Sequence, residues 1–168
     1  MGEKPVYLFN DGDGSGEYLL NWWRALEEDK GERALLRRAL GPDEVSLTPA
    51  YVRLLFGLKA KGHHVNQKKL AIIAGLVSHI ERETDASLAA SMAEPKAGGS
   101  GARVSGLRFR KLLAVKDAED LYQLMLRTIR MLDKTASLYD LAKSIYWWNE
   151  RTRREWAYDY YSRATDEK

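Results

Sequence analysis

The sequence predicts an all-α fold, and three observations support that prediction. Apolar residues recur with helical spacing from one end of the chain to the other. Capping residues, Pro or Gly stand where the helices would begin or end. No stretch combines apolar alternation with the turn chemistry of paired strands. With 168 residues, of which 45% are hydrophobic, the chain can bury a core as one domain or as two small packed halves.

The chain begins with a segment over 1–16 that we expect to be flexible, and an N-terminal helical half over 17–83 follows. The first helix is expected at about 17–29, where the apolar stripe consists of Leu19, Trp22, Trp23 and Leu26. A short second helix follows Gly31, and the pair "GP" at Gly41 and Pro42 ends it.

Two further helices complete this half. The third has Thr48 as its N-cap and Pro49 at the first helical position, and it ends at Gly62. The fourth opens at Asn66 and is apolar nearly all round over residues 70–80. Such a helix is expected to be buried on several sides, at the centre of the N-terminal half.

The connection over 84–106 separates the two halves. It is rich in Ala, Gly and Ser and contains one Pro, "TDASLAASMAEPKAGGSGARVSG". This composition predicts a linker or long loop.

The C-terminal helical half is expected over 107–163, with a short tail over 164–168. Its first helix is "RFRKLLAVK", and Asp117 caps the second. The third is predicted as one continuous helix from Ser137 to about Tyr161.

The sequence offers no catalytic constellation, so we expect neither enzymatic activity nor a cofactor. Its glycines do not form a phosphate-binding loop. The stretch "DGDGSG" over 11–16 imitates the opening of a calcium loop, but Trp22 stands where a bidentate Glu is needed. His63, His64 and His79 lack the spacing of metal ligands. We therefore also expect no metal site.

Composition indicates the cellular compartment in which the protein is expected. The chain has no cysteine, which fits a reducing environment. No apolar run approaches the roughly 18 residues needed to span a bilayer, and the first residues lack the apolar core of a signal peptide. We expect a cytoplasmic protein without membrane contact.

Positive charge gathers in the C-terminal part. From Gly101 onward the chain carries 14 Lys and Arg against 10 Asp and Glu, whereas the first hundred residues carry 13 against 14. On the helix "GLRFRKLLAVK", a helical wheel turns Phe109, Leu112 and Leu113 inward. The same wheel leaves outside this sector the cations Arg108, Arg110 and Lys111.

The next two helices show basic ridges with the spacing i, i+4, i+7, i+11. On the second helix, the ridge opposite the apolar stripe consists of Gln123, Arg127, Arg130 and Lys134. On the last helix it consists of Lys143, Trp147, Glu150 and Arg154, with Arg151 alongside. Trp147 is expected to be an exposed aromatic within a basic line.

These ridges favour binding of a polyanion. Lys and Arg neutralise phosphates, and aromatic faces stack on bases. Three ridges on consecutive helices would form one groove for a nucleic acid. The alternative left open is that the cations form ordinary solvated faces and that the tryptophans lie in the core or an interface.

Three blocks of sequence carry a family resemblance. They are "WWRAL" with "GERALLRRAL", then "GLRFRKLL", then "WWNERTRREWAYDYY". Their order and spacing resemble the CasB family, the small subunit of the type I-E CRISPR surveillance complex called Cascade. The resemblance extends from about Leu19 to Tyr161 and is carried by the three blocks together.

The resemblance implies an all-helical protein of two small helical parts, present as two copies in an RNA-guided complex. It implies no catalysis, partner subunits of the complex, and contacts that hold the target DNA strand and the displaced strand, with guide RNA nearby. In such complexes base pairing reads sequence, while protein contacts backbone and shape.

The resemblance also identifies basic positions. The matches within its blocks are Arg37, Arg38, Arg108, Arg110, Lys111, Arg151, Arg153 and Arg154, with Lys68 as a weaker match. The helical ridges add Arg127, Arg130, Lys134 and Lys143. The segment "PVYLFNDGDGSG" and the Ala/Gly-rich connection match no family block, so no binding role is assigned to them.

Two rival functions remain. In one, the protein is a structural helical adaptor that docks protein partners without contacting nucleic acid. In the other, "NQKKLAIIAGLVSHI" belongs to a helix-turn-helix regulator, but this segment is too apolar for a recognition helix.

Overall fold

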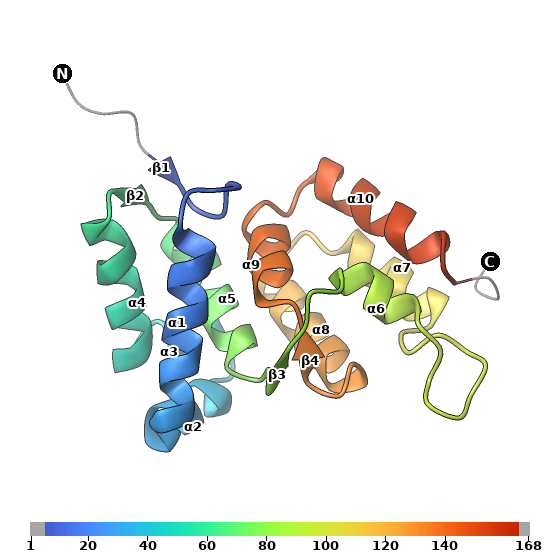
Figure 1. Ribbon diagram of the computed structural model, residues 1–168, viewed down its shortest axis with the longest axis horizontal. Helices are drawn as coiled ribbons and strands as arrows, with labels where there is room; N and C mark the ends of the chain where they lie inside the picture. Colours follow the sequence, from blue (N-terminus) through green and yellow to red (C-terminus); the bar gives the residue numbers. More distant parts are fainter. Residues whose placement is uncertain (1–5, 165–168) are drawn as a thin grey trace.

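The structure is a computed structural model that describes residues 6–164. It is predominantly α-helical, as predicted (Figure 1). Its helices are α1 (Ser15–Glu28), α2 (Lys30–Arg38), α3 (Pro42–Val45), α4 (Pro49–Ala60), α5 (Gln67–Val77), α6 (Leu88–Ala93), α7 (Gly106–Ala114), α8 (Ala118–Met131), α9 (Leu138–Tyr146) and α10 (Glu150–Tyr161). No helix within the described residues is both long and apolar enough to cross a membrane.

Helix α5 lies at the centre of the fold. All its residues from Leu70 to Val77 are buried, in agreement with the apolar surface that the sequence predicts. It packs against α3 and α4 on its own side and against α8 and α9 on the other. Figure 1 shows α1 to α5 on the left and α6 to α10 on the right. One hydrophobic cluster runs through both groups.

Short parallel strand pairs join segments that are distant in sequence. Strand β1 (Val6–Tyr7) pairs with β2 (His63–His64), and β3 (Arg82–Glu83) pairs with β4 (Thr135–Ala136). The second pair connects the chain that follows α5 to the turn between α8 and α9. Strands of two residues are too short to leave an alternating pattern in the sequence.

The prediction of a flexible segment over 1–16 is wrong for its described part, and residues 1–5 lie outside the described residues. Leu8 and Phe9 are fully buried. The carbonyl of Leu8 accepts a hydrogen bond from Trp147 Nε1 at 2.9 Å, and the amide of Phe9 donates to Ser15 Oγ at 2.8 Å. Of these partners, Trp147 lies far along the chain, and local composition does not reveal such a contact. Likewise, Ala164 in the predicted tail is buried, and residues 165–168 are not described.

The prediction of a linker over 84–106 is wrong in its middle. Helix α6 occupies residues 88–93, begins at a Ser87 cap and buries most of its small side chains against α10. Gly, Ser and Pro in this connection are typical of loops. Ala, however, favours a helix, and its small side chain allows two helices to approach closely. The Gly-Pro pair expected only to end a helix also begins one, because Pro42 is the first residue of the short helix α3.

The prediction of one helix from Ser137 to Tyr161 is also wrong. The chain leaves the helical path at residues 147–149, between α9 and α10. Asn149 caps α10, because its Oδ1 accepts from the amide of Thr152 at 3.0 Å. The Thr152 hydroxyl donates to the carbonyl of Trp147 at 2.6 Å, which fixes the break.

We expect Gly75→Ala in α5 to lower the free energy of unfolding by about 1 kcal/mol. A Cβ there would lie 2.7 Å from the Tyr122 hydroxyl oxygen and 2.9 Å from Val45 Cγ2. Overpacking costs about 1–3 kcal/mol, and the helix propensity of Ala recovers about 1 kcal/mol. Urea denaturation measures the change. Gly101→Ala is the control, since nothing lies within 4 Å of its Cβ. A Gly75→Ala variant as stable as wild type would contradict the packing described.

We expect Trp147→Phe to speed amide hydrogen exchange at Phe9 by about fivefold, because it removes a hydrogen bond worth about 1 kcal/mol that ties the N-terminal segment to α9. Trp148→Phe is the matched control. It also loses one indole hydrogen bond, at 3.0 Å to the Val115 carbonyl, but Val115 precedes α8. Equal exchange at Phe9 in both variants would show that the indole of Trp147 does not anchor this segment.

Candidate nucleic-acid interface

Helix α7 is attached by one face and presents cations on the others. Ser105 caps it by accepting from the amide of Arg108. Phe109 is fully buried, and its ring stacks on Tyr160 with centroids 3.9 Å apart and planes 9° apart. The cations exposed to solvent, as predicted, are Arg108, Arg110 and Lys111.

Helix α8, like α7, buries its apolar face and exposes cations of its predicted ridge. Its apolar stripe is buried, while Arg127 and Arg130 are exposed. Lys134 does not continue this ridge, because α8 ends at Met131 and Lys134 has a φ of 57° in the turn beyond. The prediction of four positions on one helical line is therefore wrong at its last member.

A hollow of about 130 Å³ lies between α7 and α8. Arg108 and Lys111 line it from α7, and Arg127 lines it from α8. Its remaining walls are Leu112, Leu124, Thr128 and Met131. The structure therefore brings two of the three predicted basic helices together around one depression.

A second hollow of about 340 Å³ adjoins the first, since Arg108 and Met131 line both. Arg130 reaches it from α8, and the loop after α6 adds two more cations. We call the combined surface the α7–α8 basic face, which consists of Lys96, Arg103, Arg108, Lys111, Arg127 and Arg130. Among the described residues that line the two hollows, Asp133 is the one carboxylate, and it lies 3.9 Å from Arg103.

Lys96 and Arg103 were not predicted as site residues. An antiparallel bridge joins Pro95 to Ala102, and the amide of Arg103 donates to the Glu94 carbonyl at 2.8 Å. This bridge folds the connection back beside the end of α8. No periodicity in the Ala/Gly-rich sequence indicates it, because the contacts are between backbone groups.

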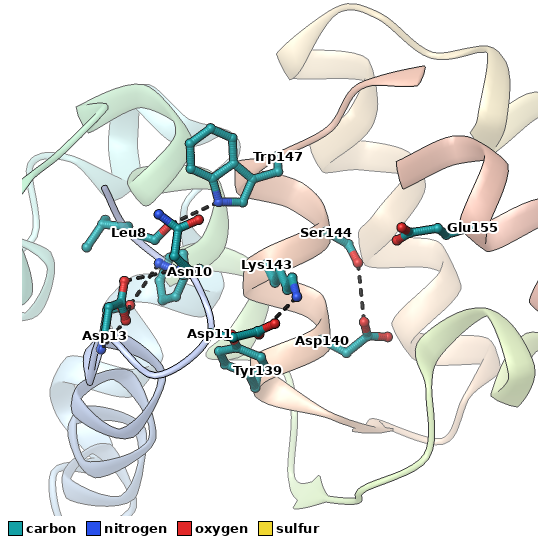
Figure 2. Close-up of polar contacts among 12 residues, drawn as sticks. Leu8, Asn10, Asp11, Asp13, Tyr139, Asp140, Lys143, Ser144, Trp147 and Glu155 are labelled. Carbon is teal, nitrogen blue, oxygen red and sulfur yellow. Dashed lines mark hydrogen bonds and ion pairs between the residues drawn. The ribbon is translucent and has the colours of Figure 1, made fainter. Parts of the chain in front are cut away.

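The third predicted ridge does not join this surface. Lys143 in α9 lies 3.0 Å from Asp11 of the N-terminal segment (Figure 2). In α10, Arg151 pairs with Glu155 and Arg154 pairs with Glu150, each one turn away. None of these cations lines either hollow of the α7–α8 basic face. The helix break between α9 and α10 also separates Lys143 from the line predicted for it.

The prediction that Trp147 is an exposed aromatic is wrong. It is partly buried against the core, and its indole donates to Leu8 (Figure 2). Arg153 is half-buried beside Trp148, with its guanidinium 5.7 Å from that ring. The alternative left open, tryptophans in the core, holds for this stretch.

The predicted cations of the N-terminal half do not line the hollows of the α7–α8 basic face. Arg37 is half-buried and donates from Nε to the Ser78 carbonyl at 2.7 Å. Arg38 is exposed in a hollow with Leu35 and Leu47. Lys68 is exposed in the first turn of α5.

The acidic groups near α9 have structural partners. Hydrogen bonds from Tyr139 and then Lys143 hold the pKa of Asp11 below its usual value (Figure 2). Burial raises the pKa of Asp140, whose carboxylate accepts from the amide of Leu88 at 2.7 Å and caps α6. Asp13, in the stretch that imitates a calcium loop, accepts from the amide and hydroxyl of Ser15. The described residues contain no group of three acidic or histidine side chains placed to hold a metal.

Comparison with known proteins gives a family and a fold. Residues 32–161 match the family model of CRISPR-associated protein Cse2. A chain in the crystal structure of E. coli Cascade bound to a PAM-containing dsDNA target is 23% identical, with a TM-score of 0.67 over 87% of this chain and 95% of that chain. CasB from Thermus thermophilus is 20% identical, with a TM-score of 0.69 over 88% and 97%. No curated protein matches the sequence.

The family match spans most of the chain and contains the second and third sequence blocks in full. The two structural matches independently show the same fold. The predicted resemblance to the CasB family is thus confirmed, and the chain belongs to the family of CRISPR-associated protein Cse2.

Proposed function

We propose that the protein is a non-catalytic subunit of an RNA-guided Cascade complex and that it holds nucleic-acid backbone on the α7–α8 basic face. The main observation behind this proposal is that six cations line two adjoining hollows. Among the described residues that line them there is one carboxylate. Membership of the Cse2 family supports the assembly, as does the likeness to a chain of a Cascade structure bound to a dsDNA target.

The chemistry of the α7–α8 basic face suits a phosphate backbone. Its cations come from two helices and a loop, so they spread over a surface on which successive phosphates can lie. Each phosphate that Lys or Arg neutralises releases condensed counterions, which favours binding without regard to sequence. This matches the division of labour in which base pairing reads the target and protein contacts the backbone.

Within that assembly we assign the target and displaced strands of DNA as ligands, with guide RNA nearby. We also propose that each complex contains two copies of the chain and that its location is cytoplasmic.

The two helical halves, over 17–83 and 107–163, act as one packed unit because a single hydrophobic cluster joins them. Arg38 and Arg110, two exposed cations of the family blocks, lie outside the α7–α8 basic face, as does the weaker match Lys68. They are secondary candidates for backbone contact.

One observation favours the alternative, a structural adaptor that docks protein partners. Leu40 and Leu47 are 75% and 83% exposed, and Leu35 is 45% exposed. Leu35 and Leu47 line a hollow of about 320 Å³ beside Pro49. Exposed apolar residues gathered in this way are typical of protein contacts. The surface lies on the N-terminal half, so docking there and backbone binding on the α7–α8 basic face are compatible.

We expect the double variant Arg108→Gln and Arg127→Gln to reduce the slope of log affinity for single-stranded DNA against log salt by about 1.4, since each phosphate contact contributes about 0.7. Fluorescence anisotropy across a salt series measures the slope. The matched control is Arg151→Gln with Arg154→Gln, which removes the same charge from carboxylate-paired cations. Equal slopes for both double variants would contradict this assignment of the interface.

We expect Leu40→Ser with Leu47→Ser to reduce co-purification with the other Cascade subunits several-fold while leaving the salt slope for DNA unchanged. The control is Phe56→Ser, which removes another exposed apolar side chain, outside the hollow. Loss of assembly by the leucine variant, with no DNA affinity in any sample, would favour the pure adaptor. Unchanged assembly would remove these leucines from the partner contact.

A further inference from the structure

A second group of cations lies where the two helical groups meet, next to β3 and β4. We call it the seam cluster. It consists of Arg33, Arg37, His79, Glu81, Arg130 and Lys134. It draws on α2, the chain after α5, the end of α8 and the turn that leads into β4. Arg130 belongs to both this cluster and the α7–α8 basic face, so the two positive surfaces are continuous.

The two arginines of α2 are held by neutral acceptors. Arg37 donates to the Ser78 carbonyl at 2.7 Å, and Arg33 donates from Nη2 to the Ile80 carbonyl at 3.1 Å. These carbonyls lie at and beyond the end of α5, where cations are favourable. Carbonyl groups satisfy the N–H donors, but they do not cancel the charges.

Glu81 is the single carboxylate of the seam cluster. Its Oε1 lies 3.9 Å from Arg37 Nη2 and 3.4 Å from Lys134 Nζ. Glu81 thus pairs with two of the four cations of the seam cluster. The Glu81 side chain is 48% exposed, so it can leave this position for solvent at little cost.

Two buried nitrogen atoms of the seam cluster lack a hydrogen-bond partner in the described part of the chain. Arg37 Nη2 and His79 Nε2 are shielded from solvent and have no hydrogen-bond partner among the described residues. Burial, and then the charges of Arg37, Arg130, Lys134 and Arg33, lowers the pKa of His79 to about 4. The imidazole is therefore neutral at physiological pH, because burial first, and the nearby positive charges second, disfavour its protonated form.

A purely structural role explains only part of this arrangement. Capping the carbonyl end of α5 accounts for Arg33 and Arg37. It does not account for Arg130, which is exposed and forms no ion pair within the described residues. Nor does it account for Lys134, which turns toward the same carboxylate as Arg37. A phosphate, with several acceptor oxygens, would bridge cations of both elements.

We propose that the seam cluster is a binding site for a backbone phosphate and that Glu81 occupies this site until nucleic acid displaces it. The inference rests on the proposed function and extends it, since it carries the bound strand from the C-terminal half to α2. The phosphate lies between Arg37 and Lys134, with Arg130 leading to the α7–α8 basic face. Displaced Glu81 turns to solvent, and a phosphate oxygen that accepts a hydrogen bond from the unpartnered His79 Nε2 favours the protonated imidazole.

The first test compares two neutralised carboxylates on neighbouring positions. Glu81→Gln is expected to tighten binding of a thymidine oligonucleotide about fivefold, because a competing charge is removed from the site. Glu83→Gln is the matched control, since Glu83 lies two residues further along, is exposed in β3 and forms no ion pair among the described residues. Equal tightening by both variants would overturn the proposal, because it would reflect net charge alone.

The second test reads His79 directly by following its imidazole resonance in NMR titrations of pH. The pKa of His79 is expected to rise when the oligonucleotide or inorganic phosphate is added, while the resonances of His63 and His64 in β2 serve as internal references. Lys134→Gln should reduce the rise. Lys30→Gln, at the other end of α2, should preserve it. A His79 resonance indifferent to both anions would overturn the site.

The two proposals fail in different ways. The oligonucleotide could bind with the expected salt slope while Glu81→Gln leaves its affinity unchanged and the pKa of His79 does not move. This result would support the α7–α8 basic face and overturn the seam site. If inorganic phosphate shifts His79 but no oligonucleotide binds, the anion site stands and the nucleic-acid function falls. A response of His79 to inorganic phosphate only, with normal oligonucleotide binding elsewhere, would show an adventitious ion only and overturn the proposal.

Discussion

The burial of α5 is the constraint on which the rest of the structure depends. Every side of this helix from Leu70 to Val77 is apolar or small and withdrawn from water. Such a surface is stable only when other elements cover it all round, and elements from both ends of the chain do so. The halves are consequently packed against each other. Gly75 permits this closeness, because Tyr122 and Val45 occupy the space that a Cβ would need.

This packing determines which cations are available. Helices α7 and α8 each direct an apolar stripe inward, so their arginines and lysines remain in solvent around shared hollows. Lys143 of α9 pairs with Asp11 instead, and Arg151 and Arg154 pair with carboxylates within α10 itself. Exposed ion pairs contribute little to stability, but they reduce the net positive field that a polyanion meets. The difference between the two surfaces therefore lies in their charge partners rather than in their numbers of Lys and Arg.

At the seam between the halves, the packing that covers α5 and an excess of cations occur together. The same contacts that cover α5 bring α2 and the end of α8 close to one another, and each contributes cations. Two of these arginines also hold the carbonyls beyond α5, so the position needed for folding is adjacent to the position suited to an anion. His79 is depressed in pKa because burial and like charge act in the same direction.

Local sequence determined the features that depend on helical period alone. The all-α class, the buried surface of α5 and the outward positions of Arg108, Lys111, Arg127 and Arg130 follow from the 3.6-residue repeat. The caps at Thr48, Asn66 and Asp117 could also be predicted from the sequence, because a cap acts within one helical turn. The family resemblance also resided in the sequence, in the order of its blocks.

Only the tertiary structure decided the features that depend on partners distant along the chain. Leu8 is ordered because Trp147 reaches it, α6 forms where α10 covers its small residues, and Arg103 joins the candidate site through backbone pairing. The break between α9 and α10 removed the third basic ridge, although its helical spacing in the sequence was as regular as that of the second. A periodic pattern specifies which face of a helix is turned inward. Which groups meet there, and whether a charge finds a partner, depends on long-range packing that the pattern does not encode.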